Sequence, residues 1–248
     1  GAASFGMLSL LTVLWFRRWS YEIFIRTHQL LAGLCVYGIW RHLPSGADSP
    51  RLYIYIGLGI FGLTSSMQFL TFLYQNGLFA GRGSPRAIVS CDRHEKSSSD
   101  TDDGTGIVIK VSLIVPRPVK VKAGQYINLW MPSVSLWSWV QTHPFMVTSW
   151  SRGKQDALDL LVQPHSGMTA GLLRQARAIP GSSVSFLAFF TGPHGISADV
   201  SHYENALVVA SGFGIAAVIP YVKKMIHGYN TCTSQIRRLH LVWQVESI

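Results

Sequence analysis

His143-Pro144-Phe145-Met146-Val147-Thr148-Ser149-Trp150 is the stretch that most constrains the fold of this 248-residue chain. It reads as a short strand, because Pro144 fixes the backbone at the strand start and the following aromatic and hydroxyl side chains offer a face to a planar ring. An ordinary strand start with a packed aromatic side chain fits the same letters. Context decides between the two, since the stretch follows three apolar segments and precedes a glycine-rich turn.

The composition indicates a protein that lies partly in a membrane. Hydrophobic residues make up 48% of the chain and charged residues 13%, which is more apolar than a typical soluble protein. The net charge of +9 is scattered or flanks apolar runs, so nucleic acid is not an expected partner. A basic balance suits anionic lipid and a site that holds phosphates. The three cysteines are far apart without CxxC spacing, so neither a disulfide framework nor a zinc site is indicated.

Three apolar segments precede the quoted stretch, at residues 1–16, 22–40 and 52–73. The first has about 16 residues, fewer than the roughly 20 that cross a bilayer, so it is expected to be the end of a spanning helix. Arginines follow the first and third segments, which predicts that everything after Tyr74 lies in the cytosol. These arginines are Arg17, Arg18, Arg82 and Arg86.

From Ser84 onward, alternating β-branched residues predict a β-rich domain outside the membrane. Strands are expected at 87–89, 107–115, 121–130 and 184–190, and a helix at 169–178. The polar tract 92–106 cannot bury a core and is expected to be a flexible hairpin excursion. Residues 191–195 read as a turn that joins this domain to the next.

After Gly195 the pattern is strand 206–210, glycine turn 211–214, helix 215–227 and strand 239–243. This order predicts the first unit of a parallel α/β nucleotide domain. The expected domains are therefore 1–80 (transmembrane helices), 81–195 (β-barrel) and 196–248 (partial α/β domain). Because the chain lacks an initiator methionine and such a domain needs more strands, we expect a piece of a longer protein, truncated at both ends.

His28 and His42 are 14 residues apart, close to four helical turns and about 21 Å of rise, so they are predicted to share one face of one helix. Ionisable groups in a spanning segment usually face a cofactor, and imidazole is a common axial ligand of heme iron. The alternative is that the two histidines lie at opposite membrane interfaces, where a histidine side chain costs little free energy. Each heme would need a second ligand from another helix, and the sequence offers no second spaced pair.

Two glycine-containing segments precede predicted helices. Residues 166–169 could hold a diphosphate at a helix N-terminus, although plain N-capping explains them as well. Gly212-Phe213-Gly214 lies between a strand and a helix, as a dinucleotide cradle requires. No acidic residue stands at the ribose-binding distance, and Lys223 and Lys224 are available to an extra phosphate, which favours NADPH over NADH.

The ordered set of motifs resembles the ferric reductase and NADPH oxidase superfamily, most closely the fungal ferric-chelate reductases. The resemblance runs from residues 17–24 through His28 and His42 to 192–195 and 211–214. It implies a ferredoxin-reductase-like architecture: a bundle of transmembrane helices, an antiparallel β-barrel FAD domain and the start of a Rossmann-like NADPH domain.

The resemblance also implies cofactor-binding residues. FAD contacts are expected at His143, Pro144, Phe145, Met146, Val147, Thr148 and Ser149, and at the diphosphate turn Gly167, Met168 and Thr169. Met146 stands where the family usually has a threonine near the reactive edge of the isoalloxazine, so the hydroxyl hydrogen bond of that threonine is not expected here, although Thr148 or backbone N–H groups could substitute. Gly212, Gly214 and Ile215 match the start of the NADPH site. His28 would bind the cytosolic heme b and His42 the outer one.

The function implied by the resemblance is a plasma-membrane reductase that passes electrons from NADPH through FAD and heme b to extracellular ferric or cupric chelates. Its flavin and nucleotide domains would face the cytosol, and no acid or base residue is assigned. Two alternatives stay open: a superoxide-generating NADPH oxidase, and a catalytically silent membrane flavoprotein that associates with an intact reductase.

Overall fold

The computed structural model describes residues 6, 21–44, 48–77, 81–91, 108–134, 138, 141–165, 167–178 and 183–245. The chain divides into two compact units, Gly1–Thr71 and Phe72–Ile248, which we call the helical unit and the sheet unit. The predicted apolar segment 1–16, apart from Gly6, and the polar tract 92–106 lie outside the described residues.

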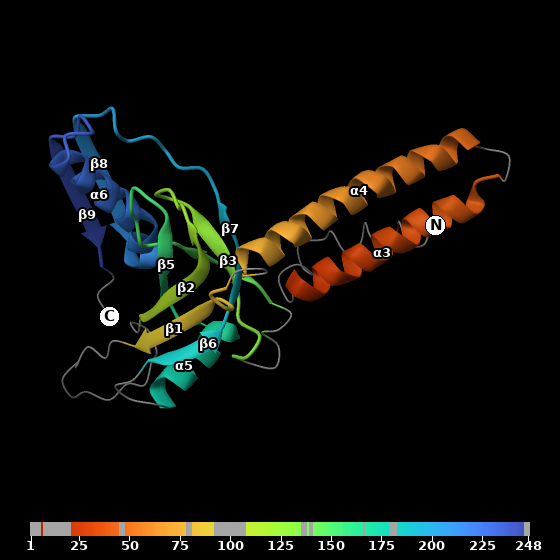
Figure 1. Ribbon diagram of the computed structural model, residues 1–248, viewed down its shortest axis with the longest axis horizontal. Coiled ribbons are helices and arrows are strands. Elements are labelled where there is room, and N and C mark those ends of the chain that lie inside the picture. The colour runs from red at the N-terminus through yellow and green to blue at the C-terminus, as the bar shows by residue number, and fades with distance from the viewer. Residues whose placement is uncertain are drawn as a thin grey trace. The chain divides into compact units, whose positions relative to one another are not determined.

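The helical unit holds α3 (Tyr21–His42) and most of α4 (Asp48–Gln75). The two helices lie side by side (Figure 1). Near the connecting loop, Trp40 Nε1 donates a hydrogen bond to Tyr55 Oη (3.0 Å), and the Arg51 guanidinium lies 5.9 Å from the Trp40 ring centre. Among the described helices, α4 is the one that is long and apolar enough to cross a membrane, over Pro50–Gln75. The 26 residues rise about 39 Å, against roughly 30 Å for a hydrocarbon core.

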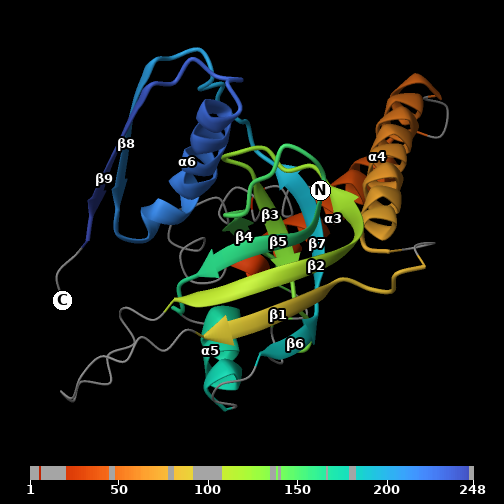
Figure 2. The same ribbon diagram turned by 60° about the vertical axis from the view of Figure 1, so that its left-hand side comes forward.

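The sheet unit begins with two antiparallel sheets (Figure 2). The first has the strand order β5-β2-β1-β6, and the second the order β4-β3-β7. A single bridge between Val147 and Leu160 links them. The strands of the first sheet are β1 (Arg86–Cys91), β2 (Ile109–Val119), β5 (Gln155–Val162) and β6 (Val184–Leu187); those of the second are β3 (Tyr126–Trp130), β4 (His143–Met146) and β7 (Phe189–His194).

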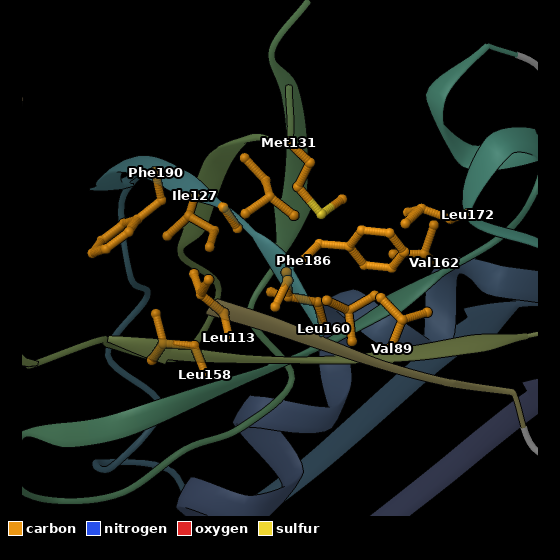
Figure 3. Packing of buried hydrophobic residues seen from close by; sticks show 14 of the residues in the cluster. Val89, Leu113, Ile127, Met131, Leu158, Leu160, Val162, Leu172, Phe186 and Phe190 are labelled. Atoms are coloured by element: carbon orange, nitrogen blue, oxygen red, sulfur yellow. The ribbon is translucent and has the colours of Figure 1, made fainter. Parts of the chain in front are cut away.

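One apolar core lies between these sheets, because every second side chain of each strand points inward. The inward face of β2 consists of Ile109, Val111, Leu113 and Val115, all buried. Helix α5 (Met168–Ala178) adds Met168, Leu172 and Ala176 to the core. Figure 3 shows Leu172 beside Val162 and the side chains of both sheets interlocking.

Four sequence predictions need correction here. Residues 184–190 form two strands in different sheets, with a break at Ala188, whose N–H donates to the Pro85 carbonyl (3.2 Å). Residues 121–125 form a turn before β3, because Gly124 has a φ of +83°. Residues 191–194 are the end of β7, paired with β3, where a turn was predicted. Strand β5 was not predicted.

The rest of the sheet unit is a strand–helix–strand unit. It consists of β8 (Asn205–Ser211), a 3₁₀ turn (Gly212–Gly214), α6 (Ile215–Asn230) and β9 (Arg238–Gln244). Strands β8 and β9 pair in parallel from Asn205↔Arg238 to Ser211↔Gln244. The order of elements is the predicted one, and its role in nucleotide binding stays a prediction.

Candidate functional site

The pairing of β4 with β3 decides which way each residue of the quoted stretch points. His143 lies opposite Leu129 and Phe145 opposite Ile127, and both partners are buried core residues. Side chains directly opposite each other share one face of a sheet, so His143 and Phe145 face inward at the edge of the second sheet. Their rings lie 6.5 Å apart. Pro144 and Met146 therefore lie on the outer face of this sheet.

His143 carries a polar atom that the fold leaves unsatisfied. Its Nε2 is buried, and within the described part of the chain no group hydrogen-bonds to it. A buried polar atom without a partner costs about 1–3 kcal/mol, and such atoms in native structures call for an explanation. An acceptor or donor on a bound cofactor would satisfy it.

The N-terminus of α5 lies close to the start of β4. Gly167 precedes the helix with a φ of +60°, and a Cβ placed there would lie 3.8 Å from Oε1 of Gln141, two residues before His143. The first turn of α5 contains no acidic residue. Its N–H groups have no intrahelical partners and carry the positive end of the helix dipole, so this corner suits an anion such as a diphosphate.

The side chains of this turn take separate roles. Met168 is buried in the core, so only its backbone is available to a ligand. The Thr169 hydroxyl accepts a hydrogen bond from the His165 N–H (3.1 Å), which closes the loop before the helix.

The side chains in the second half of the quoted stretch make contacts within the protein. Val147 and Thr148 are buried, and the Thr148 hydroxyl donates to the Asp159 carbonyl (3.0 Å). The Ser149 hydroxyl accepts from the Asp159 N–H (3.1 Å). The proton of the Thr148 hydroxyl is therefore engaged with β5, and a contact of this hydroxyl with the flavin stays a prediction.

The glycine turn between β8 and α6 has the backbone that a close approach requires. Gly212 has a φ of +48°. Gly214 precedes α6, which begins at Ile215, and the first turn of this helix has no acidic residue. Trp243 Nε1 donates to the Gly212 carbonyl (2.9 Å), which ties the end of β9 to the turn. The turn thus presents N–H groups at a helix N-terminus, as a nucleotide phosphate would need.

The lysines expected to serve that phosphate lie elsewhere. Lys223 Nζ donates to the Thr148 carbonyl (2.9 Å), and Lys224 Nζ lies 3.8 Å from the Asp199 carboxylate. Both follow Ile215 by more than two turns, about 12 Å of helix rise. The structure therefore does not support the use of these lysines to favour NADPH.

Helix α3 contains both candidate heme ligands. The 14-residue spacing leaves them about 40° apart around the helix axis, so they share a face as predicted. His28 lines a cavity of about 980 Å³ between α3 and α4, walled mainly by apolar and aromatic side chains. His42 lies in the last turn, is exposed and does not line this cavity.

Known proteins match this chain in sequence. An FAD-binding domain matches residues 105–198, which contain the quoted stretch and α5. Ferric reductase transmembrane component 3 of Saccharomyces cerevisiae is 26% identical over 226 residues, covering 89% of this chain and 28% of that protein. Ferric reduction oxidase 4 of Arabidopsis thaliana is 27% identical over 213 residues, covering 85% of this chain and 26% of that protein. Over most of its length the chain is therefore similar to ferric reductases, and residues 105–198 match an FAD-binding domain.

The chain spans about a quarter of the length of these curated relatives. Among solved structures, the ferredoxin-NADP+ reductase of Plasmodium falciparum matches with a TM-score of 0.46 and 14% identity, covering 66% of this chain and 59% of that chain. The predicted FAD-binding fold with antiparallel sheets is confirmed, and closure of the two sheets into a barrel is supported in part by the Val147–Leu160 bridge.

Two features of the sheet unit were not predicted. The outer face of the second sheet carries an aromatic cluster, in which the Trp130 ring lies 5.2 Å from Phe189 and 6.4 Å from Phe72. Beside it, the Asn76 side chain donates to the Phe190 carbonyl (2.8 Å) and accepts from the Phe190 N–H (2.9 Å). Helix α4, strand β3 and strand β7 each contribute one ring to the cluster, so no local sequence pattern marks it, and nothing in the local sequence marks Asn76.

Proposed function

We propose that this chain is part of a membrane ferric-chelate reductase that carries electrons from NADPH to extracellular ferric or cupric ions. One observation carries the proposal: an FAD-binding domain follows, in the same chain, a helix long and apolar enough to cross a membrane. When bound, FAD would supply the step from two-electron to one-electron transfer and heme b the path across the bilayer. The relatives that match over most of the chain carry ferric reductase names.

In this proposal the FAD diphosphate lies against the backbone N–H groups of Gly167, Met168 and Thr169. His143, with Nε2 protonated, donates a hydrogen bond to a phosphate oxygen, which satisfies its buried nitrogen. Pro144 and Met146, on the outer face of β4, would make apolar contacts with the flavin, while Phe145 would contact the cofactor from the inner face beside His143. The residues that follow this strand hold it in position, because their side chains contact the core and β5; they are Val147, Thr148 and Ser149.

The remaining roles follow the spacing of the motifs. The turn at Gly212, Gly214 and Ile215 holds the nucleotide phosphates. His28 would bind the iron of the cytosolic heme and His42 that of the outer heme. None of these residues transfers a proton in the reaction, so their work is to fix the order and separation of the redox groups. The flavin and nucleotide domains face the cytosol, and the membrane is the plasma membrane.

Expression of the full-length protein that contains this chain, in cells that lack their own surface reductase, tests the proposal. We expect ferric-chelate reduction that depends on the chelate and resists superoxide dismutase. Superoxide release without chelate would overturn this function in favour of an oxidase. The absorption spectrum of the purified chain tests the other alternative, because a flavin band without a heme Soret band would favour a silent flavoprotein.

A further inference from the structure

A groove lies between the β2–β3 turn and the C-terminal half of α6. It consists of two adjoining cavities of about 130 and 380 Å³, which share Trp150, Arg152, Ser201 and Lys224. The larger cavity extends to residues 120–123 and the smaller one to Gly228, Thr233 and Ser234. The larger volume falls in the range of small-molecule sites.

The groove is strongly cationic. Its walls carry Lys120, Lys122, Arg152 and Lys224, against the single carboxylate of Asp199. Over the described residues, no salt bridge engages Lys120, Lys122 or Arg152. Lys224 is the more enclosed cation, with a side chain 26% exposed, and its contact with Asp199 is long at 3.8 Å. Cations gathered around a concave surface attract anions more strongly than the same charges spread over a flat one.

Asp199 does little to neutralise this charge. Its Oδ1 accepts a hydrogen bond from the Ser201 N–H (3.0 Å), and its Oδ2 lies 3.2 Å from His202 Nε2. The Ser201 backbone bond, with smaller contributions from the Ser201 side chain, His202 and Lys224, holds the pKa of the Asp199 carboxyl below its ordinary value. At neutral pH the carboxylate is ionised and directed mainly at its own loop.

The inner end of the groove carries an unsatisfied hydroxyl. Ser234 Oγ is buried and, within the part of the chain that the structure describes, has no hydrogen-bond partner. Close packing holds it there, since a Cβ on Gly228 would lie 2.7 Å from this oxygen. Trp150 forms one wall, with its ring 5.3 Å from His227 in an edge contact.

The groove is separate from the proposed cofactor sites. None of the residues assigned to FAD, NADPH or heme lines either cavity. Lys224 lies nine residues beyond Ile215, about 14 Å of rise from the glycine turn at the other end of α6. The cations therefore have no task in the electron path.

We propose that this groove binds a phosphate-bearing ligand. Arg152 and Lys224 contact the phosphate oxygens, Lys120 and Lys122 flank the open side, and the Ser234 hydroxyl donates at the inner end. Trp150 covers the apolar part of the ligand. The site does not depend on the reductase function, so either proposal can fail without the other.

Titration calorimetry with inorganic pyrophosphate tests the site, using the full chain in phosphatidylcholine nanodiscs with FAD at saturation. Saturating FAD removes the competing anion position at α5. We expect Arg152→Gln and Lys224→Gln each to weaken pyrophosphate binding about tenfold, the usual loss of one charge-assisted hydrogen bond. Asp199→Asn should strengthen binding by much less than tenfold, because this carboxylate is the only acidic group among the described residues of the groove but is directed mainly at its own loop.

Charge-matched controls separate a site from general attraction. Arg177 on α5 and Lys110 on β2 are exposed and do not line the groove, so Arg177→Gln and Lys110→Gln should leave binding unchanged. Absence of pyrophosphate binding, or equal weakening by all four lysine and arginine variants, would overturn the proposal.

A second lipid composition distinguishes the source of the phosphate. In nanodiscs with about one-tenth phosphatidic acid, a lipid headgroup in the groove would compete and lower the apparent pyrophosphate affinity. Unchanged affinity would show that the ligand is a free phosphate compound. Both outcomes support the site, because both require the groove to accept phosphate.

Discussion

At His143, we expect the stability of the fold and the binding of the cofactor to favour different side chains. Its buried Nε2 lowers the stability of the protein without FAD. In His143→Phe we expect the free energy of unfolding without FAD to be unchanged or up to about 1 kcal/mol higher, because no polar atom is left unsatisfied. The FAD dissociation constant should rise about tenfold with the loss of the phosphate contact. Thermal unfolding and flavin fluorescence quenching measure the two effects.

His194 offers the matched control. Its Nε2 lies 3.1 Å from the Thr191 hydroxyl and its ring 5.5 Å from Tyr126, so its imidazole already has partners. His194→Phe should lose this hydrogen bond and gain no stability. If His143→Phe binds FAD as tightly as the unaltered chain, His143 has no part in the cofactor site.

Met146 is the residue at which this chain departs from the family motif. It is partly exposed on the outer face of β4, opposite Tyr126, so a smaller side chain there leaves the core intact. We expect Met146→Thr to bind FAD about 2- to 10-fold more tightly, because a hydroxyl would add one hydrogen bond to the ring edge. Met146→Leu, which lacks a hydroxyl, is the control. Equal flavin affinity and equal flavin absorption in both variants would remove this residue from the site.

Among the structural elements, the last turn of α4 is fixed to β7 by one buried amide. Asn76 is 7% exposed, and its Nδ2 donates to the carbonyls of Phe72 and Phe190, both at 2.8 Å. In Asn76→Asp a carboxylate would face these carbonyls without protons to donate. We expect a loss of about 2–3 kcal/mol in the free energy of unfolding, measured by urea titration.

Gln75 provides the comparison for Asn76. Its Nε2 donates a single, partly buried hydrogen bond to the Gly192 carbonyl (3.0 Å). Gln75→Ala should therefore cost only about 0.5–1.5 kcal/mol. Similar losses in the two variants would mean that the buried amide adds nothing beyond an ordinary side-chain contact.

Helix α6 packs on the β2–β3 turn through a glycine. A Cβ on Gly124 would clash with the Tyr221 ring, 2.7 Å from Cε2, and the Gly124 φ of +83° is itself unfavourable for other residues. Tyr221 Oη also accepts a hydrogen bond from the Ala198 N–H (3.0 Å), so the ring cannot move freely. We expect Gly124→Ala to lower the free energy of unfolding by at least about 2 kcal/mol.

Gly153 is a suitable control for Gly124, because a Cβ there meets nothing within 4 Å and its φ is not positive. Gly153→Ala should leave the unfolding midpoint nearly unchanged. Should both variants unfold at the same midpoint, the contact between Gly124 and Tyr221 does not hold α6 in place.

Helices and strands with a regular pattern of apolar and polar residues could be predicted from the sequence. Strands whose ends depend on hydrogen bonds to distant residues could not. Strands β1 and β2 and helices α5 and α6 follow directly from periodicity. The run 184–190 looks continuous, yet Ala188 bonds to Pro85 and divides it between two sheets. In β5, Leu158, Leu160 and Val162 do alternate inward, but Leu161 interrupts the polar positions and hides the period.

The candidate site shows the same limit. Sequence motifs identified β4, the turn at Gly167 and the turn at Gly212, because proline at the start of a strand and glycine in a turn each indicate a particular backbone conformation. They did not show that Thr148 and Lys223 contact partners elsewhere in the sheet unit, since both partners are backbone carbonyls far away in sequence. Every residue has a backbone carbonyl, so the sequence does not show which carbonyl accepts a given side-chain hydrogen bond.

At the scale of the whole molecule, the two units meet different solvents in the proposed reductase. The apolar side chains of α4 are exposed along the helix, whereas those of the sheet unit are enclosed in one core. Exposed apolar side chains of this length are favourable in lipid and unfavourable in water. A change in the middle of α4 should therefore affect membrane insertion and leave flavin binding alone.

Leu63 lies near the centre of the Pro50–Gln75 span, is 64% exposed and does not line the His28 cavity. A lysine at the centre of a spanning helix costs about 2.5–3.5 kcal/mol of insertion free energy, whereas one near an end can reach the interface. With a glycosylation acceptor inserted between Leu43 and Pro50, we expect microsomes to modify the unaltered chain and Tyr53→Lys, but Leu63→Lys much less. FAD affinity should be the same in all three, because both substitutions lie in the helical unit. Full modification of Leu63→Lys would show that α4 does not span the membrane.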